Sequence, residues 1–442
     1  MRHHVRCNLQ RLLSVIGLCI YLSLAGVLST AQQDPPKDGR YYESLARKAY
    51  QQKDYQSFLA NMKLAAQLRP NHPRLMFNLA AAYALTGNRT EALQWLDRMT
   101  AMGLVFPADK ESDFDSIRSS AEFQTILKKV EHNRLPVING GAAFTLHEKG
   151  FIPEGIAYDP VTQTFYLGSV YKRKIVSVDK QGRARDFATA QDGLWSVMGM
   201  KVDAPRRLLW VATAAHPQMS NYDPAENGRT GLFKFDLSSG KLLKKYLLPK
   251  DSQGDTKGHW FGDLVLNTRG DVFTTDSVTP AIYLVSRDKD ELEIFLEDPA
   301  FVNLQGLDFS SDGKHLFVAD YAKGLFVIDL ATKKVVSPEP APDITLLGID
   351  GLYSYRGTLL AVQNGINPPR LVRLFLNGAR NRVERLTTLR ANDPIFDEPT
   401  LGVLVKNNFY LIANSQWGAI DAQGRLAPAE KLKEPVVLKV RL

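Results

Sequence analysis

The chain has 442 residues, of which 44% are hydrophobic and 23% are charged, a composition typical of globular protein and long enough for two domains. Its formal net charge is +8, but the basic residues are scattered rather than gathered in a stripe, which argues against a nucleic-acid-binding protein. Both cysteines, Cys7 and Cys19, lie within the first 31 residues, so a protein without those residues would have neither disulfides nor a catalytic thiolate.

Residues 1–31 have the layout of a signal peptide. A basic stretch without acids precedes an apolar run at 12–28, and Ala31 ends a group of small residues of the kind that signal peptidase recognises. We expect cleavage after Ala31, a linker over 32–40, and a secreted or periplasmic protein with no membrane span. An uncleaved membrane anchor is the alternative, because about 17 apolar residues is near the lower limit for spanning a bilayer.

Residues 41–134 are expected to be α-helical. Segments 42–70 and 76–104 align at a period of 34 residues, and apolar residues recur in both at helical spacing, which predicts two helical hairpins with a buried stripe. The matched pairs include Tyr42 with Met76, Leu45 with Leu79, Ala46 with Ala80, Met62 with Leu96 and Ala65 with Met99. The pattern resembles the tetratricopeptide repeat, although an unspecific pair of hairpins would show the same periodicity.

A further helix at about 120–132 is expected to cap the open end of the second hairpin. The repeats could bind a protein partner, or they could serve only as a spacer that packs against the next domain.

From residue 140 to the C-terminus the sequence changes to short apolar strands separated by turn residues. One phrase recurs six times: an opening polar or small residue, an apolar strand, a turn, and a second apolar strand. The copies open at Glu154, Met198, Gly262, Gln305, Asp350 and Thr400. Six copies of a unit with three or four strands predict a six-bladed β-propeller over 140–442, so the expected fold is mainly β with an N-terminal α-helical, tetratricopeptide-like domain. Segment 142–147 could supply the outer strand that the last copy lacks.

The residues that open the copies are expected to line one mouth of the central channel, because they begin the innermost strands. Glu154 and Asp350 are carboxylates, and Asp263 follows Gly262 directly. Gln305 adds an amide oxygen. Such oxygens converging on one axis suit a hard divalent cation such as calcium, and without it the carboxylates would repel one another and raise a pKa. Alternatively, these groups only hydrate the channel or cap the strands.

The phrases Pro153-Glu154-Gly155 and Ile349-Asp350-Gly351 resemble site motifs of the senescence marker protein and gluconolactonase family, and the resemblance covers most of residues 140–440. It implies a calcium-dependent propeller that hydrolyses sugar lactones, with Glu154 and Asp350 as ligands and Asp350 also as the base. Two positions depart from the family: Gly262-Asp263 stands where Asn-Asp is expected, and Gln305-Gly306 where Asn-Gly is expected.

Other residues are expected near the same mouth. His216 lies in the long loop 213–230, which we expect to form a rim or lid, and His259 precedes the third copy; both are alternative proton carriers, and His216 could also contact substrate. The residues that end the second strands could bind a polyol or simply cap turns: Asp276, Asp320, Asn364 and Asn414.

Two functions remain open from the sequence. The first is metal-dependent hydrolysis of a lactone, ester or sugar derivative, in which the cation polarises the carbonyl and Asp350 activates water. The second is a non-catalytic propeller that binds a small molecule at its mouth or acts as a scaffold, with helical repeats that bind a protein partner.

Overall fold

The structure is a computed structural model that describes residues 37–249 and 258–442. The predicted signal peptide and both cysteines lie outside the described residues. Within the described ranges, no helix is long and apolar enough to cross a membrane.

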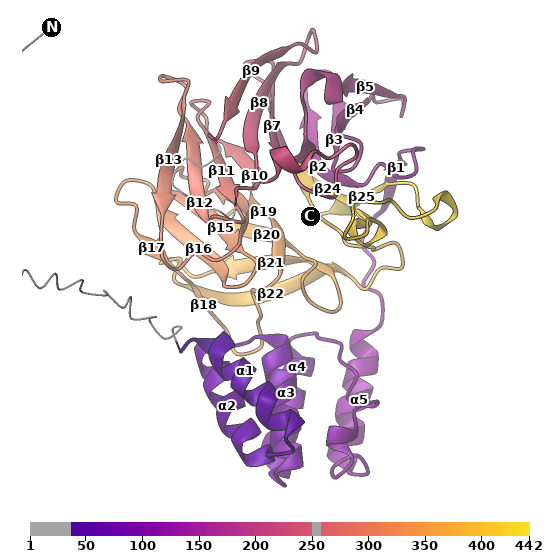
Figure 1. Ribbon diagram of the computed structural model, residues 1–442, viewed down its shortest axis with the longest axis vertical. Helices are drawn as coiled ribbons and strands as arrows, with labels where there is room; N and C mark the ends of the chain where they lie inside the picture. Colours follow the sequence, from indigo (N-terminus) through magenta and orange to yellow (C-terminus); the bar gives the residue numbers. More distant parts are fainter. Residues whose placement is uncertain (1–36, 250–257) are drawn as a thin grey trace, which may run out of the picture. The chain divides into compact units, whose positions relative to one another are not determined.

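Five α-helices come first in the described part of the chain (Figure 1). They are α1 (Gly39–Gln51), α2 (Tyr55–Leu68), α3 (Pro73–Leu85), α4 (Arg89–Ala101) and α5 (Ala121–Asn133). Side-chain caps fix three of their starts: Asp38 accepts hydrogen bonds from the first turn of α1, Asp54 from α2 and Ser120 from α5. The recurring apolar residues are buried between the helices as the periodicity predicts, and α5 packs beside α4 through contacts such as Lys129 with Asp97.

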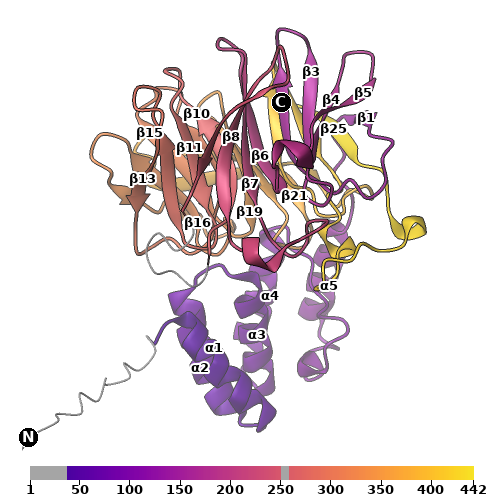
Figure 2. The same cartoon turned by 45° about the horizontal axis from the view of Figure 1, so that its top comes forward.

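The rest of the described chain forms six antiparallel sheets, the blades of a six-bladed β-propeller (Figures 1 and 2). Blade 1 comprises β2 (Pro153–Asp159), β3 (Thr164–Ser169), β4 (Lys174–Val178) and β5 (Ala184–Ala188). Blade 2 comprises β6 (Ser196–Asp203), β7 (Leu208–Ala214), β8 (Thr230–Asp236) and β9 (Leu242–Leu247). Blade 3 comprises β10 (Phe261–Leu266), β11 (Val272–Asp276), β12 (Ala281–Val285) and β13 (Leu292–Glu297).

Blade 4 comprises β14 (Leu304–Phe309), β15 (His315–Asp320), β16 (Gly324–Asp329) and β17 (Val335–Val336). Blade 5 comprises β19 (Ile349–Tyr355), β20 (Thr358–Gln363), β21 (Arg370–Leu376) and β22 (Arg382–Ala391), with β18 (Glu339–Pro340) added in parallel to β22. Blade 6 comprises β23 (Gly402–Val405), β24 (Asn408–Ile412), β25 (Val436–Arg441) and β1 (Gly141–Thr145).

The ring is closed by strands from both ends of the propeller sequence. Strand β1 pairs antiparallel with β25, with Ala142 opposite Leu438. The expected supply of the missing outer strand from the segment before blade 1 is thus confirmed. Such closure protects the strand edges that could otherwise recruit other chains.

The innermost strands are irregular at the residue that opens each copy. In blades 1 to 5 the pairing register shifts where Glu154, Met198, Gly262, Gln305 and Asp350 stand. A β-bulge interrupts the alternation of a strand and re-aims a side chain. The bulges therefore turn the opening residues out of the strand ladder at the start of the channel.

The glycine after the opening residue allows neighbouring blades to approach closely. A Cβ atom at Gly155 would lie 2.0 Å from the Met198 carbonyl oxygen, and one at Gly306 would lie 2.6 Å from the Asp350 carbonyl oxygen. No larger residue fits without moving the backbone of the next blade. This close approach explains why the repeated phrase contains glycine.

The hydrophobic core of the propeller lies between neighbouring blades. Trp210 of blade 2 and Leu264 of blade 3 belong to one buried cluster, and Val265 of blade 3 packs with Leu307 of blade 4 in another. Apolar residues of the repeats are used in these contacts, which leaves polar residues to line the channel mouth.

Candidate functional site

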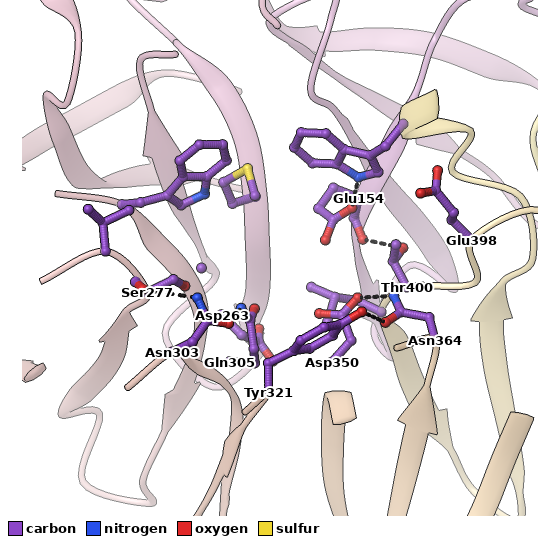
Figure 3. A pocket seen from close by; sticks show the side chains of 16 residues that line it. Glu154, Asp263, Ser277, Asn303, Gln305, Tyr321, Asp350, Asn364, Glu398 and Thr400 are labelled. Atoms are coloured by element: carbon purple, nitrogen blue, oxygen red, sulfur yellow. Dashed lines mark hydrogen bonds between the residues drawn. The ribbon is translucent and has the colours of Figure 1, made fainter. Parts of the chain in front are cut away.

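A cavity of about 390 Å³ opens where the innermost strands begin (Figure 3). Glu154, Asp263, Gln305 and Asp350, from four different blades, all contribute to its wall. The other wall residues are Met198, Trp260, Gly262, Ser277, Val278, Asn303, Tyr321, Asn364, Glu398, Thr400, Leu401 and Trp417. Among the described residues, no lysine, arginine or histidine lines this cavity, so its wall carries an excess of negative charge.

Glu154 and Asp350 are the most deeply buried acids on one side of the cavity. Their exposed fractions are 7% and 9%. The indole Nε1 of Trp417 donates a hydrogen bond of 2.8 Å to Glu154, and the side-chain amide of Asn364 donates one of 2.7 Å to Asp350. These neutral donors hold the two carboxylates in place without neutralising them.

The two carboxylates hold protons more tightly than exposed ones do. Burial, together with the nearby Asp350 carboxylate, raises the pKa of Glu154 well above its usual range. Burial raises the pKa of Asp350 to about 7, against the opposing effect of the hydrogen bond from Asn364. Desolvation and like charge both disfavour the ionised form, so a positive charge in the cavity would be stabilised.

Glu398 is a third carboxylate at this side, which the sequence analysis did not identify. It stands before blade 6 and outside the repeated phrase, and its negative charge contributes to the raised pKa of both Glu154 and Asp350. Its backbone φ is 57°, in the left-handed region that a residue with a side chain rarely adopts. The peptide N–H of Gly418 donates to its carboxylate at 3.1 Å.

Asp263 and Gln305 lie on the other side of the cavity from Glu154 and Glu398 (Figure 3). One oxygen of Asp263 is 3.6 Å from the ammonium nitrogen of Lys201, and its other oxygen has no hydrogen-bond partner. Burial raises the pKa of Asp263, and Lys201 opposes this shift. The amide of Gln305 donates to Asn303 at 2.8 Å.

The four predicted metal ligands therefore share one cavity but divide between its two sides. In the described part of the chain, no three His, Cys, Asp or Glu side chains are grouped closely enough to hold a metal ion. Glu154 and Asp350 suit a hard cation, because they offer carboxylate oxygens without a cationic partner. Asp263 suits it less well, since Lys201 already supplies a positive charge to it.

Two tryptophan rings, Trp260 and Trp417, belong to the apolar part of the wall. The imidazole of His216 stacks on Trp260 with ring centres 4.1 Å apart, and it is buried behind that ring rather than in the wall. Burial lowers the pKa of His216 to about 4, so this side chain is neutral at pH 7. Loop 213–230 contributes no residue to the wall, and His216 meets the cavity only through the rings of Trp260 and Trp417, on which it stacks. This placement does not support the expected contact of His216 with substrate.

His259 and Asp276 form a buried pair outside the cavity wall. His259 Nδ1 and Asp276 Oδ2 are 2.7 Å apart, and Asp276 also accepts a hydrogen bond from the peptide N–H of Trp260. These contacts position the segment that carries Trp260, and His259 is not among the residues that line the cavity. The expected proton-carrier role of His259 and the substrate contact of Asp276 do not agree with this placement.

The other residues that end second strands differ in role. Asp320 accepts hydrogen bonds from backbone N–H groups, including those of Val302 and Ala322, and Asn414 bridges the backbone of 434–436. Both are buried turn caps rather than cavity residues, as the alternative reading allowed. Asn364 is the exception, because it lines the cavity and bonds to Asp350.

Fold and site together define a six-bladed propeller with an acidic, tryptophan-walled cavity at its channel mouth. No protein-family model matches the chain, and no curated protein sequence matches it. Solved structures with a similar fold include a gluconolactonase from Xanthomonas campestris, with 13% identity, 70% of this chain and 97% of that chain covered, and a TM-score of 0.45. They also include regucalcin, a calcium-binding protein from Agrobacterium tumefaciens, with 14% identity, 68% and 94% covered, and a TM-score of 0.47.

A PQQ-bound aldose sugar dehydrogenase from Streptomyces coelicolor is a third such structure, with 13% identity, 69% of this chain and 99% of that chain covered, and a TM-score of 0.48. At these identities and scores the similarity carries no argument about activity, and the six-bladed fold itself follows from the strand pairing.

Proposed function

We propose that the mouth cavity binds a divalent cation, calcium, through Glu154 and Asp350 and hydrolyses a lactone, ester or sugar derivative. One observation carries the proposal: two carboxylates from blades 1 and 5 are buried in one cavity whose described wall has no basic residue. A cation between them would offset both the desolvation and the repulsion that raise their pKa values.

The residues of the chain have the properties that such a reaction needs. A bound divalent cation would polarise the carbonyl of the substrate. Asp350 is buried in the cavity, and as an ionised carboxylate it is suited to accept a proton from water. Asn364 orients Asp350, and Tyr321 in turn donates a hydrogen bond of 3.0 Å to Asn364. Burial raises the pKa of Tyr321 to about 12, so Tyr321 remains a donor.

The charge of the wall also favours one class of substrate. Glu398 adds a further negative charge to the wall beside the proposed pair of ligands, so the cavity favours a neutral ligand over a sugar acid or phosphate. The faces of Trp260 and Trp417 offer apolar contact for a ring. Hydrolysis of a neutral lactone or ester releases a carboxylate, and the acidic wall would promote its departure.

A non-catalytic, ligand-binding propeller is the second candidate. It is favoured by the departures from the family motif at Gly262, which places no side chain in the cavity, and at Gln305, whose side-chain N–H donates to Asn303 and leaves only the amide oxygen for a ligand. In this case the tetratricopeptide-like helices would bind a protein partner. Their groove is lined by residues of both charges and by Tyr50 and Phe77.

Thermal denaturation with calcium tests the cation site. A ligand that binds only the folded state stabilises it by about 2.7 kcal/mol at a concentration of 100 Kd, so calcium should raise the Tm of the wild type but not of the double variant Glu154→Gln, Asp350→Asn. The exposed Glu291→Gln, in the turn between β12 and β13, is the matched control and should respond like the wild type. Absence of a wild-type shift at millimolar calcium would refute the site.

A panel of neutral lactones and esters then separates the two candidates. Turnover that requires calcium and is lost in Asp350→Asn supports the hydrolase, whereas a calcium shift without turnover supports the binding protein.

We also propose that the protein is exported and begins at Gln32 after cleavage. N-terminal sequencing of the protein recovered from outside the cytoplasm should give Gln32-Gln33-Asp34. A retained N-terminus, from Met1, would favour the membrane anchor.

A further inference from the structure

The helical part of the chain contacts blade 5, the blade that carries Asp350. Ile366, in the loop between β20 and β21, is 8% exposed and belongs to the same buried cluster as residues of α3, α4 and α5. The next residue forms two further bonds: the peptide N–H of Val105 donates to the Asn367 carbonyl at 2.9 Å, and the Asn367 side chain donates to the Val105 carbonyl at 3.1 Å.

A second loop of blade 5, residues 341–348, is held by the same helices. The Asn71 side chain, between α2 and α3, donates to the Ile344 carbonyl at 3.0 Å. Arg98 of α4 donates to the Pro342 carbonyl at 3.1 Å and also to Asn71. This loop leads directly into β19, whose second residue is Asp350.

Arg370 joins both loops to the end of α4. Its side chain is only 3% exposed and donates to the carbonyl of Met102, the C-cap of α4, at 2.8 Å, where a cation is favoured by the helix dipole. It also donates to Gln363 at 2.8 Å, and Gln363 donates to the carbonyls of Thr345 and Leu347 in loop 341–348.

The residues just before Ile366 reach the cavity. Asn364, two residues before Ile366, lines the wall and donates to Asp350 (Figure 3). Gly365 packs so closely on the ring of Tyr321 that a Cβ atom there would lie 2.5 Å from it. Displacement of Ile366 cannot therefore leave Asn364 and Tyr321 unmoved, since no free space separates them.

We propose that the helices hold the mouth loops of blade 5 and thereby fix Asp350 and Asn364, with Ile366 and Arg370 as positioning residues of the cavity. The packing of the helices and the affinity of the cavity for its ligand are then coupled, and this coupling is reciprocal. A partner that shifts the helices changes binding at the mouth, and a ligand at the mouth changes the packing of the helices. Of the two measurements that test this inference, only the calcium affinity rests on the proposed function.

Hydrogen exchange of the ligand-free full chain tests the inference without any ligand. Ile366→Ala should increase exchange in β19 (Ile349–Tyr355) by about tenfold, because local opening follows lost packing. Ile328→Ala is the matched control: Ile328 is fully buried in β16, at the end away from the loop that carries Tyr321. It should leave β19 exchange at the wild-type level, and Ile366→Val should do so as well.

Calcium affinity provides the second readout. Ile366→Ala should weaken binding at least about fivefold, the lower range of measured coupling between sites, while Ile328→Ala and Ile366→Val should not. Asn367→Ala, which removes one hydrogen bond, should act in the same direction and replaces Ile366→Ala if that variant does not fold.

The outcomes for the two proposals are separable. Unchanged β19 exchange in both Ile366→Ala and Asn367→Ala would overturn the inference, whether or not calcium binds. Increased exchange in a protein that binds no calcium would leave the inference standing and refute the cation site alone.

Discussion

Replacing Asp350 with asparagine measures how much the buried carboxylate lowers the free energy of unfolding. The pKa of Asp350 is raised by folding from 3.8 to about 7. The folded chain therefore binds more protons than the unfolded chain between these values, and the free energy of unfolding falls as pH rises from about 4 to about 7. Asparagine has nearly the same shape and does not ionise, so Asp350→Asn should abolish this part of the pH dependence.

The size of the effect follows from the shift. The difference between 3.8 and about 7 corresponds to about 4 kcal/mol when fully developed. Because part of this loss is already present at pH 5, the wild type should lose a further 2–3 kcal/mol, as an order of magnitude, between pH 5 and pH 8. For a cooperative unit of about 400 residues, 1 kcal/mol shifts Tm by about 1 °C. The expected difference in Tm is therefore about 2–3 °C.

The assay is urea unfolding at pH 5 and pH 8 in the presence of a chelator, so that no cation offsets the charge. Asp350→Asn should equal or exceed the wild type in stability at pH 8, and its advantage should be smaller at pH 5. The exposed Glu291→Gln controls for the general effect of removing one negative charge.

Two results would refute this reasoning. One is the same pH dependence in the wild type and in Asp350→Asn, which would mean that Asp350 titrates as it does in the unfolded chain. The other is a variant that is less stable than the wild type at pH 8, which would mean that the ionised carboxylate is held favourably without a cation.

Two further predictions concern neighbours of the cavity. Trp417→Phe keeps an aromatic ring but removes the hydrogen-bond donor to Glu154, so it should raise the pKa of Glu154 further. It should also weaken calcium binding by about tenfold, which is the usual contribution of a hydrogen bond to a charged group. Calorimetric titration measures this change, and an unchanged affinity would contradict the prediction. Gly199→Ala should destabilise the chain by about 3 kcal/mol, because its Cβ would lie 2.6 Å from the Asp263 Cα. Gly141→Ala, which meets nothing within 4 Å, is the control and should be nearly neutral in urea unfolding.

The propeller could be predicted from the sequence because the packing of its blades requires the same kinds of residue at matching positions of the repeat. Each copy needs an apolar strand pair to pack against its neighbours and a glycine where blades come close, as at Gly155 and Gly306. The apolar strand pair recurs in every blade and the glycine in most of them, which leaves a period in the sequence. The positions of Glu154 and Asp350 at one mouth follow from that period.

The remainder of the site could not be predicted in the same way. Glu398, Trp417 and Tyr321 reach the cavity from loops that the repeat does not constrain. The turn of Asp263 toward Lys201 depends on a bulge in β10, for which the sequence has no distinct signal. His259 and Asp320 had the residue types of a site, but their partners belong to distant turns and make them structural.

Anomalous scattering from a crystal soaked in manganese, a divalent cation that also prefers oxygen ligands, tests the central claim most directly. The account predicts a single strong peak between the carboxylates of Glu154 and Asp350, and no peak there in the Glu154→Gln, Asp350→Asn variant. A wild-type crystal with no peak in the mouth cavity, or with its peak beside Asp263 and Lys201 instead, would contradict it.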